Sequence, residues 1–109
     1  MKEITFNKET YENYKDFYAQ IYKDLNGKGF MDWEDYDDLC YSADMLNEFL
    51  WYNHDKNIKY RFIGFDLEII KQEKTYDDYM YKLIFEVFEY FVSQYPNNTI
   101  EVINEEKSS

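Results

Sequence analysis

Two hydrophobic periodicities alternate along this chain, and their order restricts the fold more than any other feature of the sequence. Short stretches that alternate polar and apolar residues, or that are rich in aromatic and β-branched residues, predict strands. Longer stretches with apolar residues three and four positions apart predict helices. The predicted strands are Lys2–Phe6, Tyr60–Ile70 and Thr99–Ile103, and the predicted helices are Tyr11–Leu25, Trp33–Trp51 and Tyr76–Tyr95.

The order of these elements, β-α-α-β-α-β, predicts an α/β fold. Strands joined through helical crossovers run parallel, and the helices pack on the sheet that they connect. We therefore expect a small three-stranded parallel sheet with about three to four helices. Residues 1–103 are expected to form a single acidic domain, and residues 104–109 a frayed tail.

The ends of the helices carry recognisable signals. Thr10, Asp32 and Thr75 are predicted to cap the three helices, and Gly27 and Gly29 are predicted to end the first one. The side chains expected to point inward from the last helix are Tyr79, Leu83, Val87, Phe88, Phe91 and Val92.

Charge restricts the class of partner. The 109 residues carry a net charge of −11, with a hydrophobic content of 45% that favours a globular fold over a disordered acidic tail. A surface of this sign repels phosphates, so direct binding to nucleic acid is not expected. Basic proteins, which include most proteins that bind nucleic acid, are attracted instead.

The acidity is concentrated between Lys28 and Lys56, where eight carboxylates occur without a Lys or Arg. In the predicted second helix, Asp37, Tyr41, Asp44 and Glu48 step by four, three and four residues, so they form a row roughly 16 Å long on one side. Like charges this close repel, and a basic partner relieves the repulsion. The alternative interpretation is a solvated helix face. The predicted partner-binding residues are Trp33, Glu34, Asp37, Asp38, Tyr41, Asp44 and Glu48.

Other chemistry has little support in the sequence. Cys40 is the only cysteine, so an internal disulfide is excluded, and it falls on the predicted inner side of its helix. This cysteine usage and the polar residues 1–20, which show no signal peptide, predict a cytoplasmic protein without a membrane anchor. An EF-hand starting at Asp35 fails because Leu39 and Cys40 occupy ligand and glycine positions. We expect no metal, no cofactor and no enzymatic activity.

At pattern level, the chain resembles the barstar family of intracellular ribonuclease inhibitors. The resemblance lies in the element order and in the segments Lys2–Asn7, Phe17–Leu25, Tyr36–Leu39 and Thr99–Ile103. It implies inhibition by the second helix and the loop before it, with Asp37 or Asp44 in place of family acids and Trp33 or Phe30 in place of the loop aromatic. The family's Tyr-Tyr-Gly run before that helix is replaced by Phe30-Met-Asp-Trp33, and the helix tryptophan is absent.

The resulting hypothesis is an acidic inhibitor that blocks the basic active site of a nucleic-acid-acting enzyme, as a nuclease inhibitor or immunity protein does. One alternative is a phage-encoded anti-defence protein that mimics DNA and acts against a CRISPR nuclease or a restriction enzyme. A second alternative is an acidic interaction domain without inhibitory activity, and a small hydrolase ranks below both. A monomer is expected, with a dimer as the alternative.

Overall fold

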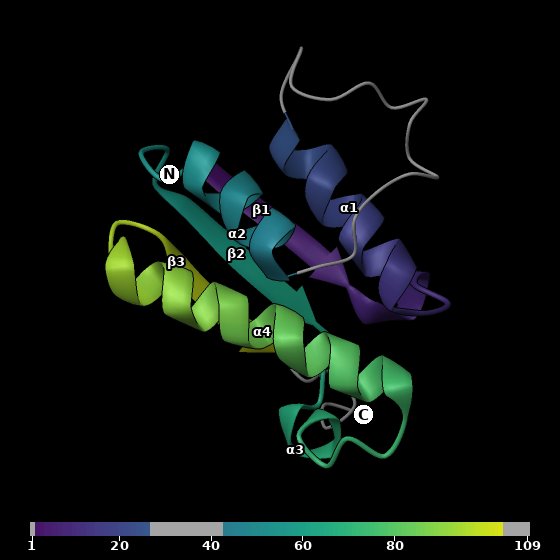
Figure 1. Cartoon of the computed structure of the whole chain (residues 1–109). Coiled ribbons are helices and arrows are strands. Elements are labelled where there is room, and N and C mark those ends of the chain that lie inside the picture. Colours follow the sequence, from purple (N-terminus) through teal and green to yellow (C-terminus); the bar gives the residue numbers. More distant parts are fainter. Residues whose placement is uncertain (1, 27–42, 104–109) are drawn as a thin grey trace.

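The computed structural model describes residues 2–26 and 43–103, and it shows a three-stranded parallel sheet with helices packed on it (Figure 1). Strand β2 lies in the centre, paired with β1 on one side and β3 on the other. This arrangement confirms the predicted α/β fold class. The strands are β1 (Lys2–Asn7), β2 (Ile58–Ile63) and β3 (Thr99–Ile103), and the helices are η1 (Lys8–Thr10), α1 (Tyr14–Asn26), α2 (Ala43–Tyr52), α3 (Leu67–Ile70) and α4 (Tyr76–Gln94).

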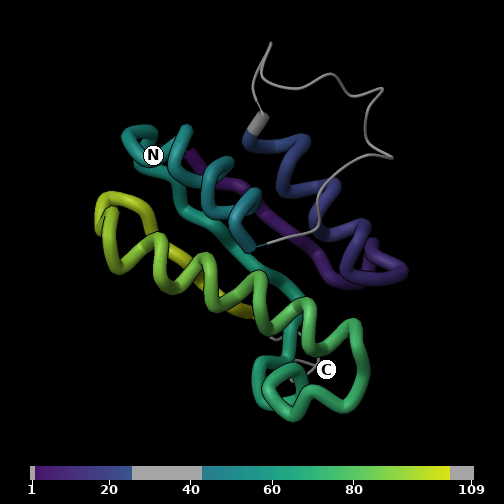
Figure 2. Tube along the Cα trace, viewed as in Figure 1, coloured from purple at the N-terminus to yellow at the C-terminus, as the bar shows by residue number. Residues whose placement is uncertain are grey.

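The two faces of the sheet differ in chemistry. Helices α1, α2 and α4 lie on one face (Figures 1 and 2), where Phe6 of β1 and Phe62 of β2 are neighbours in the register and fully buried. On the other face, Lys59 lies between Glu3 and Glu101, with its Nζ 3.9 Å from a Glu3 carboxylate oxygen and 3.0 Å from one of Glu101. Ion pairs thus occupy the face that α1, α2 and α4 leave uncovered.

The core between the sheet and the helices is mainly aromatic. The Phe62 ring centroid lies 4.8 Å from that of Phe85 and 5.0 Å from that of Phe88, both on α4. The Phe17 ring of α1 meets the Phe6 ring edge-on at 5.5 Å. Edge-to-face contacts of this kind are favourable for aromatic rings beyond the burial of their area. These rings hold α1 and α4 against the same face of the sheet.

The predicted strand Tyr60–Ile70 is too long, because β2 ends at Ile63. Gly64 follows with a positive φ of 80°, and its N–H donates to the Ile103 carbonyl at 2.8 Å. The Asp66 carboxylate then accepts hydrogen bonds from the N–H groups of Glu68 and Ile69, which starts α3. An aspartate that caps a helix in this way stops the strand from continuing.

The first helix begins later than predicted, at Tyr14, so the assignment of Thr10 as its cap is wrong. The Thr10 hydroxyl donates to the Asn7 carbonyl within η1. At the actual start, the Asn13 side chain accepts a hydrogen bond from the Lys15 N–H at 2.9 Å. The short helix η1 takes up Lys8–Thr10, and residues 11–13 connect it to α1.

The last helix matches its predicted start but differs in which side chains face the sheet. The Thr75 hydroxyl accepts a hydrogen bond from the Asp78 N–H, so the predicted cap is confirmed. Tyr79 was predicted to point inward, yet 41% of it is exposed. Leu83 and Val87 are only partly buried and line a groove beside α2. The helix is apolar over a wide stripe because it packs against both the sheet and α2.

Several predicted features lie outside the described residues. They include the helix ends assigned to Gly27, Gly29 and Asp32, the placement of Cys40, the first part of the predicted helix Trp33–Trp51, and the tail 104–109. Within residues 2–26 and 43–103, none of the helices combines the length and the apolar character that crossing a membrane requires.

Candidate functional site: the groove between α2 and α4

Two of the predicted partner-binding residues, Asp44 and Glu48, lie on α2, and both side chains are exposed. They are one turn apart, so their carboxylates share a face, and their positions differ by about 6 Å along the axis. The described α2 contains no Lys or Arg, and neither carboxylate forms an ion pair with any residue in the described ranges. We call this pair the acidic stripe. The other five predicted residues, Trp33, Glu34, Asp37, Asp38 and Tyr41, lie outside the described residues.

The buried side of α2 explains why the acidic stripe faces solvent. Leu46 and Leu50 are fully buried, and the Phe49 ring stacks on Tyr22 of α1 with centroids 4.4 Å apart. At the end of the helix, the buried Asn53 side chain donates to the Phe49 and Leu25 carbonyls. These contacts fix the rotation of α2 about its axis, which leaves positions 44 and 48 outside.

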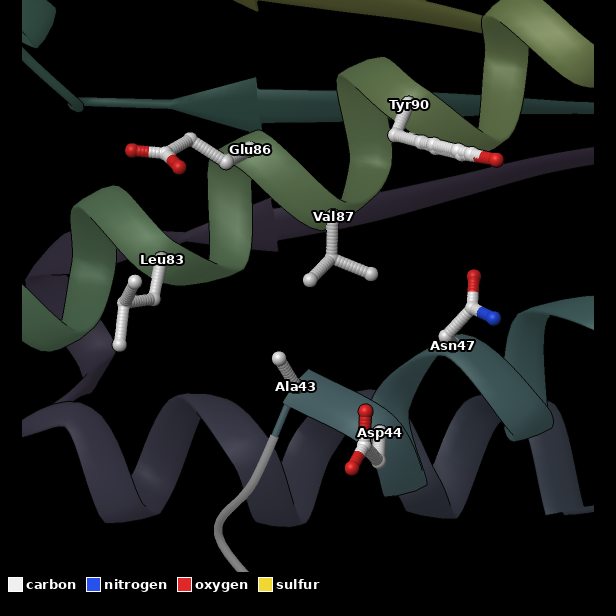
Figure 3. Close-up of a pocket in the computed structure, with 7 residues that line it drawn as sticks. All are labelled: Ala43, Asp44, Asn47, Leu83, Glu86, Val87 and Tyr90. Carbon is white, nitrogen blue, oxygen red and sulfur yellow. The ribbon is translucent and has the colours of Figure 1, made fainter.

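A groove of about 300 Å³ separates α2 from α4. Figure 3 shows Leu83 and Val87 pointing from α4 toward α2, and Ala43 pointing from α2 toward α4. These three side chains form an apolar floor between the helices. Farther along the groove, Asn47 points from α2 toward the part of α4 that carries Tyr90. Among the described residues, the lining consists of Ala43, Asp44, Asn47, Leu83, Glu86, Val87 and Tyr90.

The charge along the groove is negative. The described residues that line it include the carboxylates of Asp44 and Glu86 and no basic residue. Lys82, one turn before Glu86 on α4, is already engaged: its Nζ lies 2.8 Å from a Glu73 carboxylate oxygen and 3.4 Å from one of Glu86. The hydrogen bond to Glu73, followed by that to Glu86, raises the pKa of Lys82. Asp44 is thus left without a countercharge among the described residues.

An aromatic group follows the acidic stripe at the end of α2. Trp51, three residues after Glu48, is 48% exposed, and its ring stacks on His54 with centroids 5.4 Å apart. The His54 ring in turn lies 5.1 Å from that of Tyr95, and its Nδ1 is 2.7 Å from the Trp51 carbonyl oxygen. The site therefore presents carboxylates with a large exposed ring beside them, a combination common in protein interfaces.

The sequence did not predict the contribution of α4. Glu86 and Tyr90 are one turn apart, and Tyr90 is 56% exposed. The sequence pattern does indicate that these two side chains face away from the core, because both positions fall between the buried residues Phe85, Phe88 and Phe91. Their proximity to Asp44 depends on how α2 and α4 pack, which periodicity does not give.

Within the described ranges, no group of three or more His, Cys, Asp or Glu side chains is arranged to hold a metal ion. Comparisons of this chain with protein-family models, with curated proteins and with solved structures found no match. The candidate site therefore rests on the geometry of α2 and α4.

Proposed function

We propose that this protein is an acidic inhibitor that binds and blocks the basic active site of a nucleic-acid-acting enzyme. The observation that carries the proposal is the acidic stripe, Asp44 and Glu48, which is exposed on α2 and has no countercharge among the described residues. Enzymes that act on nucleic acids hold phosphates with Arg and Lys side chains. An acidic helix offers those side chains carboxylates in place of phosphates.

The physics of such a complex favours fast and salt-sensitive association. A net charge of −11 steers a basic partner toward the molecule, and salt screens this steering. Within the complex, each buried charge pair makes the loss of one partner costly, at about 2–5 kcal/mol. The inhibitor needs no catalytic group, since occupying the active site is enough to keep substrate phosphates out.

The proposal includes a barstar-like arrangement, in which the second helix and the segment before it face the enzyme. It also includes action in the cytoplasm as a monomer, without a cofactor and without direct contact to nucleic acid. The sequence supports the location through its single cysteine, Cys40, which suits a reducing compartment. The exposed Trp51 beside the acidic stripe supports a protein partner, because Trp is enriched among the residues that dominate interfaces.

The test uses the full chain and a panel of purified enzymes: basic ribonucleases, basic deoxyribonucleases, a restriction enzyme and a CRISPR nuclease. The variant Asp44→Asn with Glu48→Gln removes two charges with little change in side-chain shape. We expect wild type to inhibit at least one enzyme of the panel. The double variant should raise the dissociation constant at least tenfold, and the wild-type association rate should fall as salt rises from 50 to 500 mM, since screening shortens at high salt.

A matched control separates local charge from total charge. Glu9→Gln with Glu12→Gln also removes two exposed carboxylates, but at η1 and just before α1. This control should keep at least half of the wild-type affinity. Equal binding by wild type and the α2 double variant would mean that the acidic stripe is a solvated face. A target found only among the restriction or CRISPR enzymes would assign the protein to anti-defence, and no inhibition of any enzyme would favour an acidic interaction domain.

A further inference from the structure

Tyr90 is an exposed residue of α4 that the acidic stripe does not explain. It is 56% exposed, as Tyr76 and Tyr79 of the same helix also are in part, whereas Phe85, Phe88 and Phe91 of α4 are buried. Tyr90 is one turn beyond Glu86 and lines the same groove as Asp44 on α2. Figure 3 shows its ring extending from α4 at the end of the groove that Asn47 approaches from the other helix. The Tyr90 ring on α4 and the Asp44 carboxylate and Asn47 amide on α2 therefore line the same groove.

The rest of the groove suits one long side chain. Its volume of about 300 Å³ is at the lower end of the range for small-ligand pockets. Leu83 and Val87 provide an apolar wall, against which the methylene groups of a long basic side chain pack while the charged head stays near solvent. The Asp44 carboxylate, at the α2 wall, is available for that head. Lys82 does not fill this role, because Glu73 and Glu86 already engage its ammonium group.

A groove lined by both an aromatic ring and a carboxylate distinguishes between the two basic side chains. The guanidinium group of arginine is planar, weakly hydrated and able to stack on a ring while it donates two hydrogen bonds to a carboxylate. The ammonium group of lysine is compact and strongly hydrated, so it gains less from the ring. Charge alone would attract both, and the ring adds a preference for arginine.

We propose that the groove between α2 and α4 is an arginine-selective subsite, in which Tyr90 determines the specificity and Asp44 accepts the guanidinium. This inference rests on the proposed function, because the arginine belongs to the basic partner. It adds the chemical identity of one residue on that partner. It also adds α4 to an interface that the sequence had assigned to the second helix and the loop before it.

The experiment compares two probes of equal length and charge: tetra-arginine and tetra-lysine, each with blocked ends. Nitrogen-15-labelled full-length protein is titrated with each peptide at one ionic strength, and chemical shifts are followed at Asn47, Val87 and residue 90. We expect tetra-arginine to bind about two- to fivefold more tightly than tetra-lysine, which corresponds to one cation–π contact. Tyr90→Leu should reduce this ratio to about one and leave the tetra-lysine dissociation constant unchanged.

Two further variants control for the ring and for its place. Tyr90→Phe keeps the aromatic face and should keep the ratio. Tyr76→Leu removes another exposed tyrosine of α4, outside the groove, and should also keep it. A ratio of one in wild type, a ratio preserved in Tyr90→Leu, shifts confined to other surfaces, or no binding of either peptide would each overturn the inference.

This experiment and the enzyme panel fail independently. If the acidic stripe proves necessary for inhibition while the peptides bind equally well, the arginine subsite is wrong and the inhibitor function stands. If no enzyme is inhibited but the arginine preference maps to the groove and depends on Tyr90, the subsite stands and the proposed class of partner is wrong.

Discussion

Replacing Tyr60 by phenylalanine is expected to stabilise the protein. Tyr60 lies on the central strand β2, is fully buried, and meets the Phe88 ring edge-on at 5.1 Å. Its hydroxyl has no hydrogen-bond partner among the residues that the structure describes. Tyr60→Phe keeps the ring and its packing and removes only the oxygen, so it isolates the effect of one buried polar atom.

The magnitude follows from two opposing terms. A buried hydroxyl without a partner costs about 1–3 kcal/mol, which the variant recovers. The small void left by the oxygen costs only a few tenths of a kcal/mol at about 24 cal/mol per Å³ of cavity. We therefore expect the free energy of unfolding to rise by about 1–2 kcal/mol. For a domain of this size, that corresponds to an increase in Tm of roughly 4–8 °C.

Urea unfolding followed by circular dichroism measures this change, with Tyr90→Phe as the control. The Tyr90 residue is largely exposed, so its variant should change the free energy of unfolding by less than about 0.5 kcal/mol. The reasoning is refuted if Tyr60→Phe loses stability, because a loss would mean that the hydroxyl is hydrogen-bonded in the folded protein.

Two other predictions concern buried polar groups. Asn53→Ala should lower the free energy of unfolding by about 1–3 kcal/mol in urea titrations, since it leaves the Leu25 and Phe49 carbonyls without their shared donor; Asn97→Ala, an exposed control, should cost clearly less. Burial raises the pKa of Tyr81 to about 12, and burial likewise raises that of Tyr60, so the folded protein holds both phenolic protons more tightly than the unfolded chain. The stability that this provides is complete below pH about 10, the unfolded pKa of tyrosine, and is lost as pH rises above it. The urea concentration at the unfolding midpoint should therefore decrease as pH is raised above 10. In a variant with both tyrosines changed to Phe this decrease should be smaller, and an identical decrease in that variant would contradict the assignment.

The sequence predicted the order of elements because each element has its own periodicity. Lys2–Asn7 buries every second residue, whereas α4 buries residues three and four apart, and these patterns are visible before folding. The Thr75 cap was predictable for a similar reason, since capping depends on residues within one turn. Many features set by local chemistry were thus recovered, although the Thr10 assignment was wrong.

Features set by the packing of distant elements were not. The predicted strand through Ile70 failed partly because β2 ends where the Gly64 N–H donates to the Ile103 carbonyl of β3, a contact between residues far apart in the sequence. The Asp66 cap of α3 is local, but it was not predicted. Tyr79 was assigned to the core because α4 is apolar on more than one side, and only the position of α2 decides which side is covered. The groove was unpredictable for the same reason. Asp44 and Tyr90 are 46 positions apart in the sequence, and they line one groove only because α2 and α4 pack side by side.

The one-sided sheet has a geometric consequence for the groove. Because α1, α2 and α4 all rest on the same face, the rings between the layers act as spacers that set the height of the helices above the strands. The rings of Phe85 and Phe88 on α4 pack against Phe62. The buried residues of α2 include the smaller side chains Leu46 and Leu50. The width of the groove therefore depends on ring size in the interior, and repacking the rings beneath α4 would change what the surface admits without altering any residue that lines it.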